Sequence, residues 1–131
     1  MASPVITVRE EDEFHVVQDK FSVYDIRHLP VINAAGRVVG LISQRHLYKI
    51  HSPRRLEDGQ SYYDKDALDS FILKNVMVQD PYLLKPNNTL EEAMKAMVQF
   101  KFGCIPVVND YGMPAGIITS DSIIGFFLKH A

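Results

Sequence analysis

The chain has 131 residues, 47% of them hydrophobic and 23% charged, with a formal net charge of −2 at pH 7. These fractions are typical of an ordinary globular protein and exclude disordered and fibrous classes. The single Cys104 excludes a disulfide framework and a cysteine-built metal site, and it fits a cytoplasmic protein. No stretch approaches the roughly 20 apolar residues of a membrane span. The nearly balanced charge gives no general affinity for nucleic acid, so we expect neither membrane nor nucleic acid as a partner.

The chain repeats itself. Pro30 aligns with Pro106 and Gly40 with Gly116, an offset of 76 residues at both positions. Six of the thirteen residues from Pro30 to Ile42 are identical to their counterparts without a gap. A fixed internal period of this kind indicates a tandem duplication of one structural unit.

The first unit begins with an extended segment at residues 5–8. A helix follows, and its apolar stripe comprises Phe14, Val17, Phe21 and Tyr24. Residues 29–32 form an apolar strand, Gly36 closes a tight turn, and a second strand runs to Ser43. The hydroxyl of Ser43 is placed to cap the helix that comes next.

The segment between the two units is polar from residue 51 to residue 60, which predicts a surface crossover. Residues 64–73 then have apolar side chains at helical spacing, so we expect a short helix that leads to Met77.

The second unit repeats the order of the first. Residues 82–84 are extended, and Thr89 with Glu92 forms a capping box at the start of a helix. The apolar stripe of that helix comprises Leu90, Ala93, Met94 and Met97. A strand at residues 105–108, a turn at Gly112 and a strand to Thr119 complete the unit. Because Pro114 lacks a backbone donor, we expect an edge or a bulge there.

Each unit is therefore strand, helix, strand, strand, helix, in the mixed α/β (α+β) class. We assign residues 1–51 to the first repeat, 52–73 to a linker with a short helix, and 74–131 to the second repeat. Since a unit of this size buries little surface alone, the two should pack through their sheets as one module.

The repeated motifs resemble a tandem CBS domain pair, the module named after cystathionine β-synthase. They are residues 26–31 and 103–107, which lead into and begin each apolar strand, residues 40–43 and 116–119 at the end of each hairpin, and the lead-in at residues 75–81. The chain is most similar to small stand-alone bacterial pairs of the acetoin-utilisation type. Since Met1 aligns with Met77, we expect no counterpart of the lead-in helix before the first repeat in this sequence.

The resemblance implies two repeats related by a pseudo-twofold axis, with two clefts between them. It implies a regulatory module that is not an enzyme and requires no cofactor. The expected ligands are adenosine-containing: AMP, ADP, ATP or S-adenosylmethionine. The expected partners are a second copy in a homodimer and an effector protein that the sequence does not identify.

The resemblance also implies which residues line each cleft. The better cleft, which offers adjacent basic side chains for phosphate, comprises Ile6, Thr7, Arg27, His28, Thr119, Asp121 and Ser122. The weaker cleft, which lacks an assured cation, comprises Ser43, His46, Tyr82, Leu83, Gly103 and Cys104. The family's ribose-binding carboxylate is replaced by His46 in the first repeat and by Ser122 in the second. Asp121, one residue earlier, is the candidate substitute.

Each candidate residue also has a purely structural interpretation. Ser43 and Thr119 serve equally well as helix caps, and Asp121 as a first-turn complement to the helix dipole. Cys104 is interpreted as a small buried apolar residue. The basic residues around Arg45 are interpreted as a solvent-exposed surface. Without its carboxylates the pair could instead be a protein-interaction or dimerisation module. The phenylalanines Phe100, Phe102, Phe126 and Phe127 exceed what one small core needs, and we expect some of them at a dimer interface, because apolar patches mark association sites.

Overall fold

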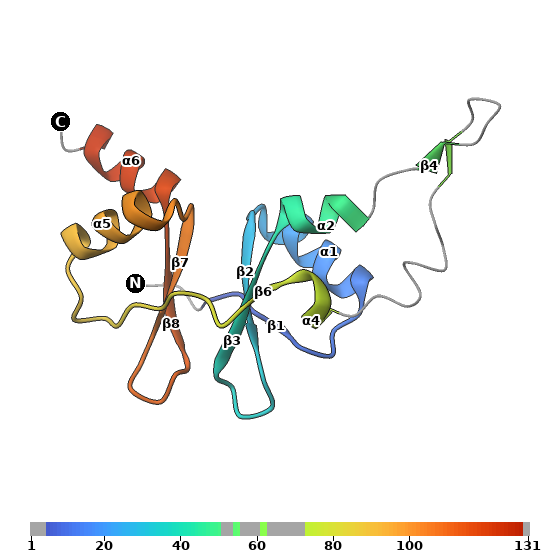
Figure 1. Cartoon of the computed structure of the whole chain (residues 1–131), viewed down its shortest axis with the longest axis horizontal. Coiled ribbons are helices and arrows are strands. Elements are labelled where there is room, and N and C mark those ends of the chain that lie inside the picture. The colour runs from blue at the N-terminus through green and yellow to red at the C-terminus, as the bar shows by residue number, and fades with distance from the viewer. Residues whose placement is uncertain (1–4, 51–53, 56–60, 63–72, 130–131) are drawn as a thin grey trace.

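The structure is a computed structural model that describes residues 5–50, 54–55, 61–62 and 73–129 (Figure 1). The elements of the first half are β1 (Val8–Arg9), α1 (Phe14–Tyr24), β2 (His28–Ile32), β3 (Val38–Ser43) and α2 (Gln44–Ile50). A small hairpin, β4 (Arg54–Arg55) with β5 (Ser61–Tyr62), follows. The elements of the second half are α4 (Leu73–Val76), β6 (Val78–Gln79), α5 (Leu90–Phe100), β7 (Cys104–Val108), β8 (Pro114–Thr119) and α6 (Ser120–Lys129).

The repeat extends to the register of the strands. Val8 pairs in parallel with Val31, and Leu84 pairs in parallel with Val107, which is the same pair 76 residues later. In the antiparallel hairpins, His28 faces Ser43 just as Cys104 faces Thr119. The predicted strand–helix–strand–strand–helix order is therefore confirmed, although residues 82–84 contribute one bridge at Leu84 instead of a strand.

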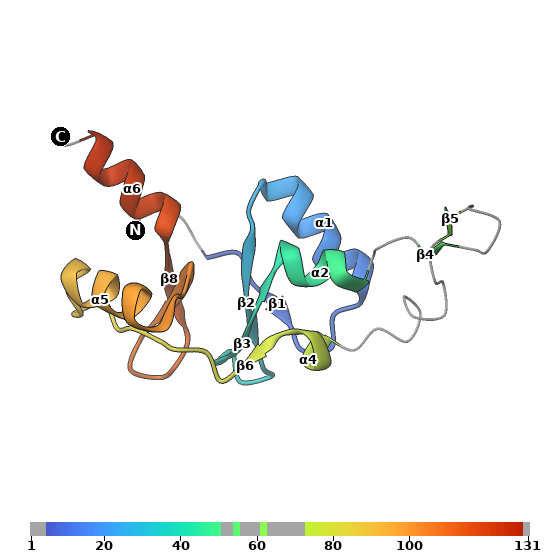
Figure 2. The same cartoon turned by 45° about the horizontal axis from the view of Figure 1, so that its top comes forward.

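The two hairpins lie side by side in the middle of the molecule, with α1 and α2 outside one of them and α5 and α6 outside the other (Figures 1 and 2). The amide of Val38 donates to the carbonyl of Gly112 at 2.9 Å, which joins the two hairpins near their turns. Gly36 and Gly112 have φ angles of 82° and 79°, the left-handed region in which glycine carries no penalty. The mixed α+β architecture agrees with the fold expected from the sequence.

The chain crosses from one half to the other through β6. This strand was not expected from the sequence, and it pairs with β3, the last strand of the first half's hairpin. Leu73 and Met77, which precede it, are buried in the core of the first half. The sheet order β1-β2-β3-β6 therefore includes a strand from each half of the chain.

The buried side chains form two clusters instead of the one core that a jointly packed domain suggested. One cluster lies under α1 and β1–β3 and includes Leu29 and Ile42, each 0% exposed. The other lies under α5 and β7–β8 and includes Ile105, also 0% exposed. Each half thus packs helices on its own hairpin. The halves are joined by backbone pairing, by the crossover and by side chains near the turns, where Met113 lies close to Gly36.

The predicted helices form, but their buried faces differ slightly from the expected stripes. Tyr24 ends α1 at 50% exposed, outside the core that Phe14, Val17 and Phe21 enter. In α5, Leu90 is 37% exposed and Ala96 is buried in its place. The capping box is confirmed, because Thr89 Oγ1 accepts from the amide of Glu92 while the Glu92 carboxylate accepts from the amide of Thr89.

Pro114 lies at an irregularity, as predicted. Opposite it, the ladder shifts between Val107 and Val108. The same register shift occurs between Val31 and Ile32, where the partner strand has no proline. The bulge is therefore a feature of both repeats that Pro114 tolerates and does not cause. The expected helix over residues 64–73 lies outside the described residues except at its last position. The expected polar crossover at residues 51–60 also lies outside the described residues, except for β4. No helix in the described part of the chain is long and apolar enough to cross a membrane.

Gly40 provides a test of this crossover. A Cβ at Gly40 would overlap the buried Met77 side chain, whereas a Cβ at Gly125 would meet nothing within 4 Å. We expect Gly40→Ala to lower the free energy of unfolding by about 1–3 kcal/mol through overpacking. Gly125→Ala should raise it by up to about 1 kcal/mol through helix propensity. Urea denaturation measures both, and equal effects would contradict the close packing of Met77 on Gly40.

Candidate functional site

Each half places the start of its last helix beside the segment that precedes its first hairpin strand. The amide of Gln44, which begins α2, donates to the carbonyl of Arg27 at 2.8 Å. The amide of Ser120, which begins α6, donates to the carbonyl of Gly103 at 3.0 Å. Because these pairs are 76 residues apart, equivalent surfaces of the two halves meet at one end of the hairpins.

The two positions that lack the expected carboxylate take part in helix capping. Ser43 Oγ accepts from the amide of His46 at 3.2 Å, and His46 Nδ1 accepts from the amide of Ser43 at 3.4 Å. Thr119 Oγ1 accepts from the amide of Ser122, and Ser122 Oγ accepts from the amide of Thr119, both at 3.0 Å. The imidazole and the hydroxyl therefore take the place of the glutamate of a capping box.

A pocket of about 460 Å³ lies between the two halves and is called here the first pocket. Its walls comprise Asp25, Ile26, Arg27, His28, Gly103, Ile117, Thr119, Ser120 and Asp121. Arg27 Nη1 and Asp121 Oδ2 are 3.9 Å apart, so an ion pair links the two repeats. Both side chains are more than three-quarters exposed, and the pair contributes little to stability.

A second pocket, of about 440 Å³, adjoins the first. Its walls comprise Arg27, His28, Ser43, Gln44, Arg45 and Gly103. The sequence assured no cation in this cleft, whereas Arg27 and Arg45 both line the second pocket. Arg45 was assigned only to a basic surface cluster. Its alignment with Asp121 under the 76-residue offset was the signal that could have placed it in the cleft.

The predicted site residues divide between these pockets and the surrounding structure. Arg27, His28, Thr119 and Asp121 line the first pocket, and Ser43 and Gly103 line the second. The others, Ile6, Thr7, Tyr82, Leu83, Cys104, His46 and Ser122, are not among the wall residues of either pocket.

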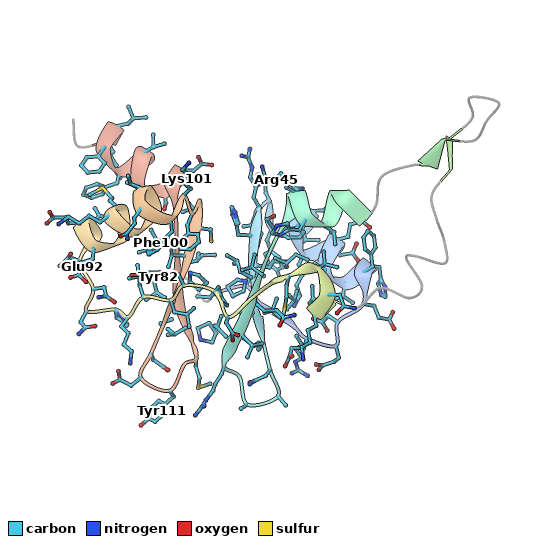
Figure 3. All side chains as sticks on the ribbon, viewed as in Figure 1. Arg45, Tyr82, Glu92, Phe100, Lys101 and Tyr111 are labelled. Atoms are coloured by element: carbon cyan, nitrogen blue, oxygen red, sulfur yellow. The ribbon has the colours of Figure 1, made fainter. Side chains whose placement is uncertain are left out.

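Three of these residues take part in other contacts. Ile6 packs on the first core. The carbonyl of Thr7 accepts from Lys20 Nζ at 2.6 Å. Tyr82 lies with Phe100 and Phe102 in a ring cluster on the second half, at centroid separations of 5.5–5.8 Å (Figure 3).

Two titratable groups near the cleft have shifted pKa values. Burial lowers the pKa of His28 below its ordinary 6.5, against the opposing effect of the nearby Asp121 carboxylate. His46 and Arg27 act in the same direction as burial. Burial also raises the pKa of Cys104 to about 12, so this thiol is protonated and acts as a small apolar side chain. Among the described residues, no three His, Cys, Asp or Glu side chains are grouped to hold a metal ion.

This arrangement of duplicated hairpins around a central cleft is that of a CBS module, and comparison with known proteins agrees. The CBS domain profile matches residues 1–52 and 73–129. The chain belongs to the CBS domain family.

Two solved structures and one relative illustrate the range of similarity. A CBS domain pair in complex with 5′-methylthioadenosine and S-adenosyl-L-methionine has a TM-score of 0.79 at 20% identity, over 100% of this chain and 94% of that one. The Vibrio cholerae protein that carries the acetoin utilization name AcuB has a TM-score of 0.76 at 25% identity, over 98% and 87%. An inosine-5′-monophosphate dehydrogenase of Korarchaeum cryptofilum is 29% identical over 91% of this chain, which spans 21% of that enzyme's length.

His28 makes the stability of the ligand-free protein depend on pH. Folding lowers the pKa of His28, so the unfolded chain binds a proton at this residue more readily than the folded chain does. Acidification below pH 6.5 therefore favours the unfolded chain and lowers the free energy of unfolding. We expect the free energy of unfolding to fall less between about pH 7.5 and pH 5 in His28→Gln than in the wild type. His15→Gln, an exposed residue on α1, should keep the steeper slope because it leaves His28 in place. Identical slopes for His28→Gln and the wild type would contradict the burial of His28.

Proposed function

We propose that this CBS pair is a cytoplasmic regulatory module that binds an adenosine-containing nucleotide of the AMP, ADP and ATP class between its two repeats. Binding shifts the balance between two arrangements of the repeats, and an effector protein responds to the shift. The observation that carries the proposal is the first pocket, where Arg27 and His28 of one repeat face Thr119 and Asp121 of the other.

The composition of the first pocket suits a nucleoside. Ile26 and Ile117 offer apolar surface to a base, and the hydroxyl-bearing Thr119 and Ser120 with the Asp121 carboxylate offer polar contacts to a ribose diol. Its volume is within the range of small-molecule sites. No cofactor is required by this proposal.

The ligands of the related CBS pair support the chemical class. 5′-Methylthioadenosine and S-adenosyl-L-methionine share an adenosine group, and they are bound by a protein whose fold this chain has. A site that holds adenosine is thus compatible with this architecture.

Thermal unfolding with AMP, ADP, ATP, NAD and S-adenosylmethionine tests the proposal. A ligand at a hundred times its dissociation constant adds about 2.7 kcal/mol of stability, a shift of several degrees in melting temperature. We expect at least one member of the panel to produce this shift. Arg27→Ala should reduce the shift, whereas Arg9→Ala, a matched arginine on β1 that lines neither pocket, should leave it intact. A flat response to the whole panel would contradict nucleotide sensing.

The second candidate function is a protein-interaction or dimerisation module with degenerate nucleotide sites. The capping roles of His46 and Ser122 favour it, because these side chains bond to their own helix starts instead of a ligand. The surface of α6 favours it further. This helix has no buried residue, and Ile124, Phe126, Phe127 and Leu128 are 48–76% exposed. Apolar surface of this extent on one helix is typical of an association surface.

The dimer is tested by light scattering. At tens of micromolar we expect a mass of twice 14.9 kDa. The double variant Ile124→Ser/Leu128→Ser should be monomeric, since it removes apolar side chains from the exposed helix. Val23→Ser provides a control, because Val23 is 74% exposed on α1 of the other half. A monomeric wild type would contradict the homodimer.

A further inference from the structure

The two pockets differ in charge. Around the first pocket, Asp25 and Asp121 outnumber the single arginine, Arg27. The described wall of the second pocket contains Arg27 and Arg45 and no acidic side chain. The difference in charge arises at equivalent positions of the two repeats, because Arg45 occupies in α2 the position that Asp121 occupies in α6. An anionic group therefore favours the second pocket.

The two pockets also differ in the side chains that supply their apolar surface. Ile26 and Ile117 line the first pocket, whereas the described wall of the second contains no apolar side chain. A purine base, which gains free energy by leaving water, therefore favours the first pocket. The first pocket therefore suits the base better, and the second suits additional phosphates better.

The two pockets share part of their walls. Arg27, His28 and Gly103 belong to the walls of both. Gly103 has no side chain at this shared wall, and a Cβ placed there would meet only Ser120 Oγ, at an ordinary contact distance of 4.0 Å. A ligand longer than the first pocket would therefore have to pass Arg27 and His28 to reach the second. Figure 3 labels Arg45 beside the start of α2, at the end of the first hairpin that lies away from its turn.

From these three observations we infer that the two pockets form one composite site for a single nucleoside polyphosphate. The nucleoside lies in the first pocket, and the phosphate chain passes Arg27 into the second pocket, where Arg45 binds its far end. This inference rests on the proposed nucleotide function and deepens it. It predicts one nucleotide per chain instead of one in each cleft, and a preference for triphosphate over monophosphate set by Arg45.

Arg45 suits this role better than Arg27. Arg27 is already paired with Asp121 across the cleft, so its charge is partly balanced before a ligand arrives. The second pocket offers no acidic group to compete for Arg45 within its described wall. A guanidinium that forms charge-assisted hydrogen bonds with terminal phosphate oxygens discriminates by phosphate number, because a monophosphate held in the first pocket does not reach it.

Isothermal titration of the whole chain in magnesium-free buffer tests the inference with adenosine, AMP, ADP, ATP and inorganic tripolyphosphate. We expect one ATP per chain, affinity that rises from AMP to ADP to ATP, and displacement of ATP by tripolyphosphate. Arg45→Ala should weaken ATP and tripolyphosphate by about tenfold or more, the lower end of the effect of a charged hydrogen bond. It should leave adenosine unchanged. The matched Arg9→Ala should bind every probe as the wild type does.

The outcomes separate this inference from the proposed function. Two nucleotides per chain, or an unchanged ratio of ATP to AMP affinity in Arg45→Ala, would overturn the composite site while nucleotide binding itself stands. Tripolyphosphate binding that depends on Arg45, without binding of any nucleotide, would overturn the proposed function and retain Arg45 as a polyphosphate ligand. If no probe binds, both are overturned.

Discussion

The cleft depends on a pair of equivalent backbone hydrogen bonds, from Gln44 to the Arg27 carbonyl and from Ser120 to the Gly103 carbonyl. Each bond holds the first residue of a helix beside the turn that enters a hairpin strand. Because these hydrogen bonds join backbone atoms only, the side chains at these positions can vary without moving the helix start away from the hairpin strand. The same backbone frame therefore presents Arg45 from one repeat and Asp121 from the other, and duplication produces two chemically different walls.

The substitution of the usual carboxylates has a local structural explanation. At the third residue after the cap, a side chain can accept from the capping residue's amide, and His46 and Ser122 both do so. The helix start is thus stabilised whether or not a ligand binds. What the chain loses is an anionic acceptor for a ribose diol at that position. Asp121 retains a carboxylate in the first pocket, which is why the two clefts are not equally changed.

Much of the fold was predictable because it follows from local patterns. The duplication, the hairpins with their left-handed glycines and the capping box at Thr89 depend on residues close together in the chain. The crossover through β6 was not predictable, since the pairing of Gln79 with Gly40 depends on how the halves meet. The exposure of Tyr24 and Leu90 was missed for the same reason: periodicity identifies a helix face but not where the neighbouring layer ends.

The sequence by itself determined the class of module, because a repeat at a fixed offset and its turn residues leave little freedom in how each unit folds. It also identified Arg27, His28, Thr119 and Asp121 as residues that would meet between the repeats. Only the tertiary structure decided that Arg45 lines the second pocket with Arg27 and His28, and that Tyr82 and Cys104 are not among the wall residues of either pocket. The physical reason is that a cleft between two halves is defined by distances across the pseudo-twofold axis, and no spacing along the chain encodes those distances.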